Sequence, residues 1–214
     1  MTVAPAGRTA KHLMIGVVVM AALAMAMASA GRSGLIGTGS ASYCDPTASH
    51  AFAPWGDTAA YALAPGGSFE SGVPAWSLSG GAKIVSGNEP FFLHGAKDKS
   101  SLLLPAGSSA TSPTMCFALG DWHTRFLMKN VGSASGSLRV SVVVPSLLGG
   151  LLTVLDGGTV QGGGSWAPSP RLELLLSNVT NLIGTRAVAF RFTPVGLGAA
   201  YQIDDVYLDP WKCM

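Results

Sequence analysis

The sequence predicts an all-β protein, an antiparallel sandwich or barrel. Short apolar or alternating runs recur between glycine, proline and other turn residues throughout residues 61–214, a spacing typical of antiparallel all-β domains. No long helical period competes with these runs. The runs that we expect to form strands are residues 82–87, 90–95, 101–107, 112–119, 124–130, 136–144, 151–158, 187–196 and 201–208.

The first thirty residues have the layout of a secretory signal peptide. Arg8 and Lys11 give a positive start, residues 13–27 form an uncharged apolar run, and Ala-Ser-Ala at 28–30 offers a cleavage site. Because this run is shorter than the roughly 20 residues that a spanning helix needs, we expect cleavage and secretion. An uncleaved membrane anchor is the alternative, and after cleavage no membrane span is expected.

The mature chain is close to electrically neutral. The full chain carries 13 Lys and Arg against 11 Asp and Glu, and cleavage removes two of the basic residues. Without a basic patch or an acidic tail, capture of nucleic acid or of an anionic membrane is not expected. Residues 31–60, rich in Gly, Ser, Ala and Pro, predict an extended N-terminal arm. Residues 61–214 are enough for one β domain with its own core.

The individual runs differ in how clearly they predict a strand. In residues 138–144, Leu and Val alternate with Arg139 and Ser141, which predicts a strand with one buried apolar face and one solvent-exposed face. Residues 171–184 fit either a strand followed by a loop or a short helix. The glycine-rich residues 155–166 are interpreted as a pair of turns, since they lack the Lys and the Ser or Thr of a phosphate-binding loop.

Two adjacent carboxylates interrupt the last run, "YQIDDVYLDP" at residues 201–210. Neighbouring residues of a strand face opposite sides, so one of Asp204 and Asp205 should point inward. An unpaired inward carboxylate is costly unless a cation or hydrogen-bond donors satisfy it. We expect Asp204 to be the inward residue, although a bulge could accompany the pair and alter the alternation.

Three cysteines in an exported chain make one disulfide plausible and leave one thiol over. We favour Cys44 with Cys116, because Cys44 lies in an irregular segment that needs tethering and Cys116 lies in an expected strand. Cys213 is then the odd thiol. It could instead pair with Cys44 or with another chain.

Two short motifs carry a resemblance to a known family. "PGGSFESGVPAW" at residues 65–76, together with "IDDV" at residues 203–206, resembles the galactose-binding-like β-jelly rolls, especially the carbohydrate-binding modules found beside bacterial xylanases and glucanases. The resemblance covers residues 62–210. It implies a jelly-roll sandwich in which the first and last strands lie side by side and Trp76 is buried, with polysaccharide as the ligand class.

The same resemblance implies a structural calcium where the chain ends meet. The matching ligands are Glu70, Asp204 and Asp205, with carbonyls near Ser68 completing a shell of hard oxygen atoms. Ser68 departs from the Gly or Asn usual in the family at that position. In the alternative without metal, Glu70 and the inward aspartate accept hydrogen bonds from turn amides.

"GNEPFFLHG" at residues 87–95 is the candidate ligand-binding stretch. Alternation would put Phe91 and Leu93 on one face and Phe92 and His94 on the other. In a sugar-binding module, flat aromatic rings stack on pyranose rings while polar groups donate and accept hydrogen bonds. The alternative is that both phenylalanines lie in the core. The expected ligand contacts are Asn88, Glu89, Phe92, His94 and Trp122.

The sequence offers no catalytic constellation. No spacing of the acidic residues marks a glycosidase pair, the histidines fit no zinc motif, and the nearest match to a nucleophile elbow, residues 132–136, has Ala in the middle. We therefore expect a non-catalytic protein.

Stretches such as "PWGDTAAY" also resemble exported proteins of high-GC Gram-positive bacteria, which implies secretion and no activity. The prediction is a secreted binding or cell-surface protein for polysaccharide or cell-wall glycan. The alternative is a self-associating structural subunit of an extracellular layer or fibre.

Overall fold

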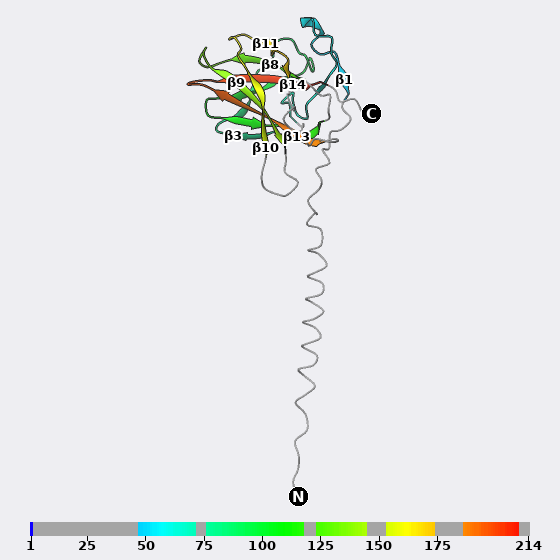
Figure 1. The fold of residues 1–214 in the computed structure, drawn as a ribbon, viewed down its shortest axis with the longest axis vertical. Coiled ribbons are helices and arrows are strands. Elements are labelled where there is room, and N and C mark those ends of the chain that lie inside the picture. The colour runs from blue at the N-terminus through cyan, green and yellow to red at the C-terminus, as the bar shows by residue number, and fades with distance from the viewer. Residues whose placement is uncertain (2–46, 72–75, 118–122, 145–152, 174–185, 210–214) are drawn as a thin grey trace. The chain divides into compact units, whose positions relative to one another are not determined.

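The protein folds as an antiparallel β-sandwich of jelly-roll type, which confirms the predicted fold class (Figure 1). Every strand pairing in the two sheets is antiparallel, and the only helical turn among the described residues is η1 (Ala53–Trp55). The computed structural model describes residue 1 and residues 47–71, 76–117, 123–144, 153–173 and 186–209.

The first sheet is organised around β14 (Tyr201–Leu208). One edge of β14 pairs with β5 (Ser100–Leu104) and, further along, with β2 (Tyr61–Leu63); its other edge pairs with β8 (His123–Asn130). The early strand β2 and the last strand β14 are therefore side by side, as the resemblance implies. The sheet also contains β1 (Ala48–Ser49), β4 (Lys83–Ser86), β11 (Ala167–Pro168) and β12 (Leu172–Glu173).

The second sheet is organised around β13 (Arg186–Val195). This strand pairs along most of its length with β9 (Ser137–Val144), which in turn pairs with β10 (Thr153–Val160). The other members are β3 (Ser77–Ser79), β6 (Ser109–Thr111) and β7 (Met115–Phe117).

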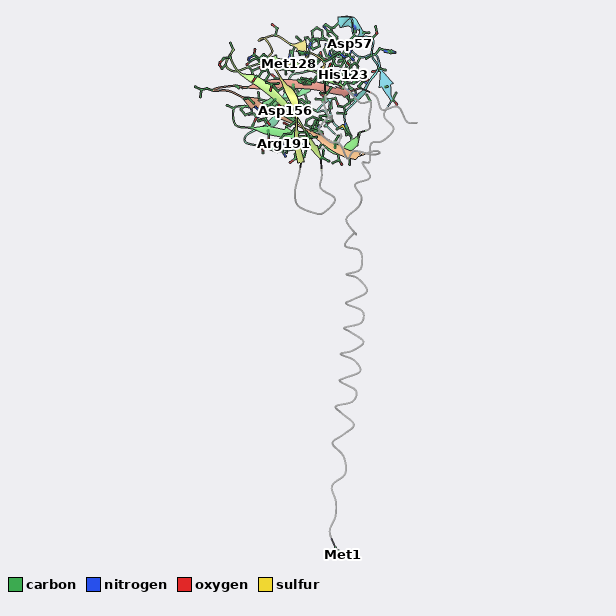
Figure 2. The ribbon with its side chains drawn as sticks, viewed as in Figure 1. Met1, Asp57, His123, Met128, Asp156 and Arg191 are labelled. Carbon is green, nitrogen blue, oxygen red and sulfur yellow. The ribbon has the colours of Figure 1, made fainter. Side chains whose placement is uncertain are left out.

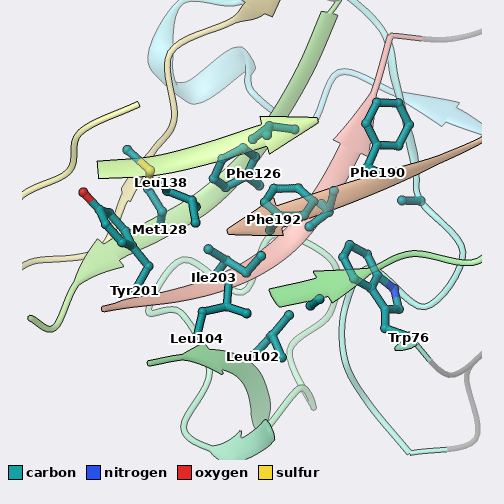
Figure 3. Packing of buried hydrophobic residues seen from close by; sticks show 14 of the residues in the cluster. Trp76, Leu102, Leu104, Phe126, Met128, Leu138, Phe190, Phe192, Tyr201 and Ile203 are labelled. Atoms are coloured by element: carbon teal, nitrogen blue, oxygen red, sulfur yellow. The ribbon is translucent and has the colours of Figure 1, made fainter. Parts of the chain in front are cut away.

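The main core fills the space between the sheets (Figure 3). Phe126 of β8 and Phe192 of β13 meet edge to face, with ring centroids 5.1 Å apart, a favourable geometry for aromatic pairs. Trp76 is buried against Phe192, as expected, and its indole Nε1 donates a hydrogen bond to the carbonyl of Pro65 at 3.0 Å. This contact ties the start of the domain to its core.

A second apolar cluster lies on the outer face of the first sheet. Leu127 follows Phe126 on β8 and therefore points away from the main core, where it packs with Phe52, Tyr61 and Tyr207. The segment 51–59, which includes η1, covers this face. The end of the expected arm is thus part of the folded domain, and the site described below is built on it.

Three sequence expectations need correction. Residues 90–95 form turns and bends, not a strand. The glycines at 157–158 do not end a strand, because β10 continues through them with a register shift between Asp156 and Gly158. Of residues 171–184, the described part contains strand β12 and no helix.

Two other predictions concern parts of the chain outside the described residues. The signal peptide falls there apart from Met1, and so do Cys44 and Cys213, so the pairing of Cys44 with Cys116 stays a prediction. Within the part of the chain that the structure covers, no helix combines the length and the apolar character that a membrane crossing requires.

Candidate functional site

Two adjacent carboxylates of β14 are buried together. Asp204 and Asp205 are 0% and 1% exposed. The pairing with β8 shifts register between Asp204 and Tyr207, and Asp205 has a φ of 48°, a left-handed conformation that is uncommon for residues other than glycine. This bulge turns both carboxylates away from solvent. Asp204 is buried as expected, but it pairs with Leu127 and so lies on the face of β14 away from the main core, and Asp205 is buried as well.

Backbone amides of the loop 87–99 supply hydrogen bonds to this pair. Asp204 Oδ2 accepts from the amide of Glu89 at 3.3 Å, and Asp205 Oδ2 accepts from the amide of His94 at 3.1 Å. The other oxygen of Asp205, Oδ1, is buried without a hydrogen-bond partner. Because an unpartnered buried carboxylate oxygen is costly, this atom is where a cation would stabilise the fold most.

Glu89 is the third buried carboxylate and shapes the loop. It is 0% exposed and accepts hydrogen bonds from the amides of Phe91 and, at 2.5 Å, of Leu93. These bonds curl the backbone, and Phe91 and Phe92 are 45% and 50% exposed. Glu89 is thus not available at the surface as the expected ligand contact. It holds the loop that exposes the two rings.

The buried carboxylates disfavour each other's ionisation. Burial is the main cause that raises the pKa of Asp204, and the neighbouring charge of Asp205 raises it further. Burial likewise raises the pKa of Asp205; the hydrogen bond from His94 opposes this, and the charges of Glu89 and Asp98 add to it. A bound cation would favour the ionised forms.

Asp205 also belongs to a group of possible metal ligands. Ligand atoms of His94, Asp98 and Asp205 all lie within 4.8 Å of one another, and His94 Nδ1 lies 2.7 Å from Asp98 Oδ2. The carboxylate oxygens suit a hard cation such as calcium, and the imidazole suits a transition metal. We refer to Glu89, His94, Asp98, Asp204 and Asp205 as the acid cluster.

The other two expected calcium ligands have different surroundings. Glu70 Oε1 accepts hydrogen bonds from the amides of Lys99 and Ser100, both at 2.7 Å, at the start of β5. Ser68 is buried, and its hydroxyl has no hydrogen-bond partner. The possible ligands that the described structure brings together include Asp205 but not Glu70. The set of Glu70, Asp204, Asp205 and Ser68 stays a prediction.

The expected ligand contacts on residues 88–94 lie in a loop. Phe91 and Phe92 are both exposed, so the alternative of two core phenylalanines is wrong, and so is the strand-like alternation between them. The side chain of His94 is 41% exposed. The Nδ2 atom of partly buried Asn88 donates to the carbonyl of Glu89 at 3.0 Å. Trp122 lies outside the described residues.

The most distinctive surface feature joins this loop to segment 51–59. Trp55 meets Phe91 edge to face, with ring centroids 5.0 Å apart and planes at 89°. Trp55 also lines an open pocket of about 550 Å³. We call Trp55, Phe91 and this pocket the Trp55 site. The other residues that line the pocket are Gly56, Asp57, Thr58, Ala59, Arg125 and Arg171.

A buried ion pair forms one wall of the pocket. Arg125 Nη1 donates to Asp57 Oδ2 at 2.7 Å, and the same oxygen accepts from the Tyr61 hydroxyl at 2.7 Å. Burial acts to raise the pKa of Asp57, but the hydrogen bonds from Tyr61 and Arg125 outweigh it and hold the pKa below 3.8. Asp57 is therefore ionised at neutral pH. In Figure 2, Asp57 lies near the top of the folded domain and Arg191 of the second sheet lies below it.

Sequence reasoning did not single out the Trp55 site. Trp55 and Asp57 are close together in "PWGDT", a stretch assigned to the arm. Arg125 precedes an apolar run on β8, where a charged residue signals a buried partner. Nothing in the sequence pattern points from Arg171 to Asp57, since the two residues meet only through the fold.

Comparisons with known proteins give a structural likeness only. No protein-family model matches the chain, and no curated protein is similar to it in sequence. Solved structures of similar fold include the CBM22-1 xylan-binding domain of Xyn10C from Paenibacillus barcinonensis. It has a TM-score of 0.43 and 13% identity, and the match covers 65% of this chain and 88% of that domain.

Two further structures are similar at a comparable level. The family 11 carbohydrate-binding module of the cellulase Lic26A-Cel5E of Clostridium thermocellum has a TM-score of 0.40 and 12% identity, covering 71% of this chain and 95% of that one. The module TmCBM61, solved with β-1,4-galactotriose, has a TM-score of 0.36 and 16% identity, covering 66% of this chain and 90% of that one.

Proposed function

We propose that the protein is a secreted, non-catalytic glycan-binding module and that the Trp55 site holds the ligand. The observation that carries the proposal is the position of Trp55. This indole lines a polar pocket and is braced by exposed Phe91. Secretion is supported by the layout of residues 1–30.

The Trp55 site has the parts that sugar recognition uses. Aromatic rings supply apolar contact area in fixed orientations, and a few well-placed polar groups orient a ligand. Trp55 contacts Phe91 and packs against the second apolar cluster, which contains Phe52. Both contacts restrict the indole before a ligand binds. Restricting a contact residue in advance lowers the entropy cost of binding. The pocket volume lies within the roughly 300–1,000 Å³ usual for small-ligand sites.

The acid cluster supports a structural role and not a catalytic one. Asp204, Asp205 and Glu89 are almost completely inaccessible, so a substrate cannot touch them. We propose that a cation, calcium by the resemblance, binds beside Asp205. The buried, unpartnered Oδ1 of Asp205 and the nearby oxygens of Asp98 support this proposal. Such an ion would hold the loop that carries Phe91 against β14.

Affinity electrophoresis tests the binding proposal. Native gels would contain soluble xylan, mixed-linkage β-glucan, β-1,4-galactan or solubilised bacterial cell-wall glycan. We expect at least one polymer to retard the protein, and Trp55→Ala and Phe91→Ala to weaken its binding about tenfold, equivalent to ~1.4 kcal/mol each. Leu197→Ala, at a 97% exposed residue outside the site, is the matched control and should bind as wild type. Retardation by none of the polymers, or unchanged binding by Trp55→Ala, would refute the proposal.

A further inference from the structure

The two arginines of the Trp55 site are held in different ways. All three guanidinium nitrogens of Arg125 make hydrogen bonds within the fold. Nη1 donates to Asp57, and Nε and Nη2 both donate to the carbonyl of Ser169, at 3.0 and 2.9 Å. Its guanidinium also lies over the ring of Phe52, 4.6 Å from the centroid. Arg125 therefore acts as a buried support, and its charge is matched by that of Asp57.

Asp57 makes no hydrogen bond to the second arginine of the pocket. Oδ2 already accepts from Tyr61 and Arg125, and Oδ1 accepts from the amide of Ala59 at 3.2 Å. Arg171 Nε lies 3.9 Å from Oδ2, beyond hydrogen-bonding distance. The contact between Asp57 and Arg171 is thus an ion pair without a hydrogen bond.

Arg171 keeps an exposed guanidinium at the pocket. Its side chain is 46% exposed, and its one hydrogen-bond partner among the described residues is His123 Nδ1, 3.1 Å from Nη2. The same ring nitrogen lies 3.0 Å from Asp209 Oδ2. Because one imidazole nitrogen cannot donate to Asp209 and accept from Arg171 at once, these two contacts compete.

The residues that line the pocket therefore carry an unmatched positive charge. Two arginines face one aspartate, and the aspartate is matched by Arg125. Asp209 pairs with His123. A guanidinium with free N–H groups binds carboxylate or phosphate oxygens in a bidentate manner. The pocket thus offers an anion contact beside the indole of Trp55.

We infer that the Trp55 site prefers acidic glycans, with Arg171 pairing with a carboxylate or phosphate group of the ligand while Trp55 contacts a sugar ring. This inference rests on the proposed function and specifies the ligand class of the same site. Uronic acids and sugar phosphates both supply the required oxygens, so the experiment needs one arm for each.

Matched polymer pairs separate the anion from the sugar. The carboxylate arm compares glucuronoxylan with the same polymer after its uronic acids have been reduced to neutral sugars. The phosphate arm compares a polysaccharide that carries phosphate monoesters on its sugars with the same polymer after phosphatase treatment. Affinity is measured by titration calorimetry at low and at high NaCl. We expect wild type to prefer one acidic polymer over its neutral partner by about tenfold, equivalent to ~1.4 kcal/mol.

Variants assign the preference to Arg171. Arg171→Gln should abolish the preference and its salt dependence, so that the acidic polymer and its neutral partner bind with equal affinity. Arg171→Lys should restore part of the preference, since lysine keeps the charge but not the bidentate geometry. Arg139→Gln is the control, because Arg139 is an exposed arginine on β9 of the second sheet.

The outcomes distinguish the inference from the function on which it rests. Equal binding of acidic and neutral polymers by wild type, or an unchanged preference in Arg171→Gln, would overturn the acidic-ligand inference and leave glycan binding standing. If no polymer binds wild type, or if Trp55→Ala binds as wild type does, the proposed function fails and the inference falls with it.

Discussion

Asp57 connects the fold to the Trp55 site. Its carboxylate accepts hydrogen bonds from Tyr61, Arg125 and the amide of Ala59, and both charges of the Asp57–Arg125 pair are almost closed to solvent. Removal of one member would leave the other charge buried and uncompensated. The shape of the pocket therefore depends on the ionised state of a single carboxylate.

Asp57→Asn should lower the free energy of unfolding at pH 7 by about 3–5 kcal/mol, the usual cost of breaking a buried pair. The folded-state pKa of Asp57 lies below its ordinary value of 3.8, so its contribution is complete at neutral pH and is lost as pH falls through the folded pKa. Urea unfolding at several pH values checks this.

The difference in stability between wild type and Asp57→Asn should shrink below about pH 4, where Asp57 protonates in the unfolded chain before it does in the folded protein. Asp156→Asn, at an exposed aspartate of β10, provides the control and should follow wild type at every pH. A difference that stays constant from neutral pH to pH 3 would contradict the assignment of the low pKa to this pair.

At the scale of single residues, the sequence indicates which charged side chains need a buried partner but not which residue that partner is. Strand alternation shows that one of Asp204 and Asp205 needs a partner inside, but the bulge that buries both depends on the pairing with β8. Likewise, the charge of Arg125 in an apolar strand predicts a partner without identifying Asp57, which is 68 residues away in the chain. Local sequence patterns do not identify contacts between segments that lie far apart in the chain.

At the scale of elements, the loop 87–99 is held at both ends. Its first part is bound through Glu89 and Asp204, and its last part through Glu70, whose carboxylate accepts the amides of Lys99 and Ser100. Hydrogen bonds from backbone amides to side-chain oxygens thus fix both ends of the loop. The two exposed phenylalanines therefore project from a braced loop.

Glu70→Ala should destabilise the protein by about 1–3 kcal/mol, because two backbone amides at the start of β5 lose a charged acceptor. The measurement is urea unfolding in the presence of a chelator, with Glu173→Ala at an exposed glutamate of β12 as control. If Glu70→Ala is as stable as wild type in chelator and loses only a calcium response, Glu70 is a metal ligand and not a brace.

Element prediction from sequence succeeds where alternation is long. Strand β9 follows the expected run 136–144 closely, because its alternating residues carry a clear period. Strand β14 also matches the expected run 201–208, although the bulge at Asp204 and Asp205 interrupts its alternation. Strands of two or three residues, such as β3 and β6, are too short to show a period. The run 90–95 resembles a buried strand in composition, but the hydrogen bonds of Glu89 make it a loop.

At the scale of the whole molecule, the acid cluster links the end of the domain to the surface loop. It joins β14, the central strand of the first sheet, to the segment that carries Phe91. A cation beside Asp205 would therefore stabilise the fold as a unit and not one loop alone. A ligand that binds only the native state raises stability by mass action.

Calcium should raise the melting temperature of residues 31–214, with a gain of about 2.7 kcal/mol at a hundredfold excess over its Kd. Asp205→Asn and Asp98→Asn should lose this gain, while Asp156→Asn should keep it. Thermal melting with calcium, with zinc and with chelator provides the readout. An equal response in all four proteins, or none in wild type, would contradict a cation at this cluster.

The sequence predicts the whole-molecule architecture well and the site poorly. Regular spacing of strands and turns is enough for an antiparallel sandwich, whereas the Trp55 site combines segment 51–59, the loop 87–99 and residues on β8 and beside β12. Segment 51–59 has no period and its sequence predicts part of an extended arm, yet it covers the outer face of the first sheet.

The most direct test of glycan binding at Trp55 is an NMR titration that follows the indole N–H signals. Each tryptophan gives one such signal, and Trp55→Phe identifies the signal of Trp55. As glucuronoxylan oligosaccharide is added, we expect the Trp55 signal to shift in a saturable manner, while that of Trp76, buried in the main core, stays in place. Saturable shifts at other tryptophans with none at Trp55 would show that the ligand binds elsewhere, and no shift at any indole would contradict glycan binding at the Trp55 site.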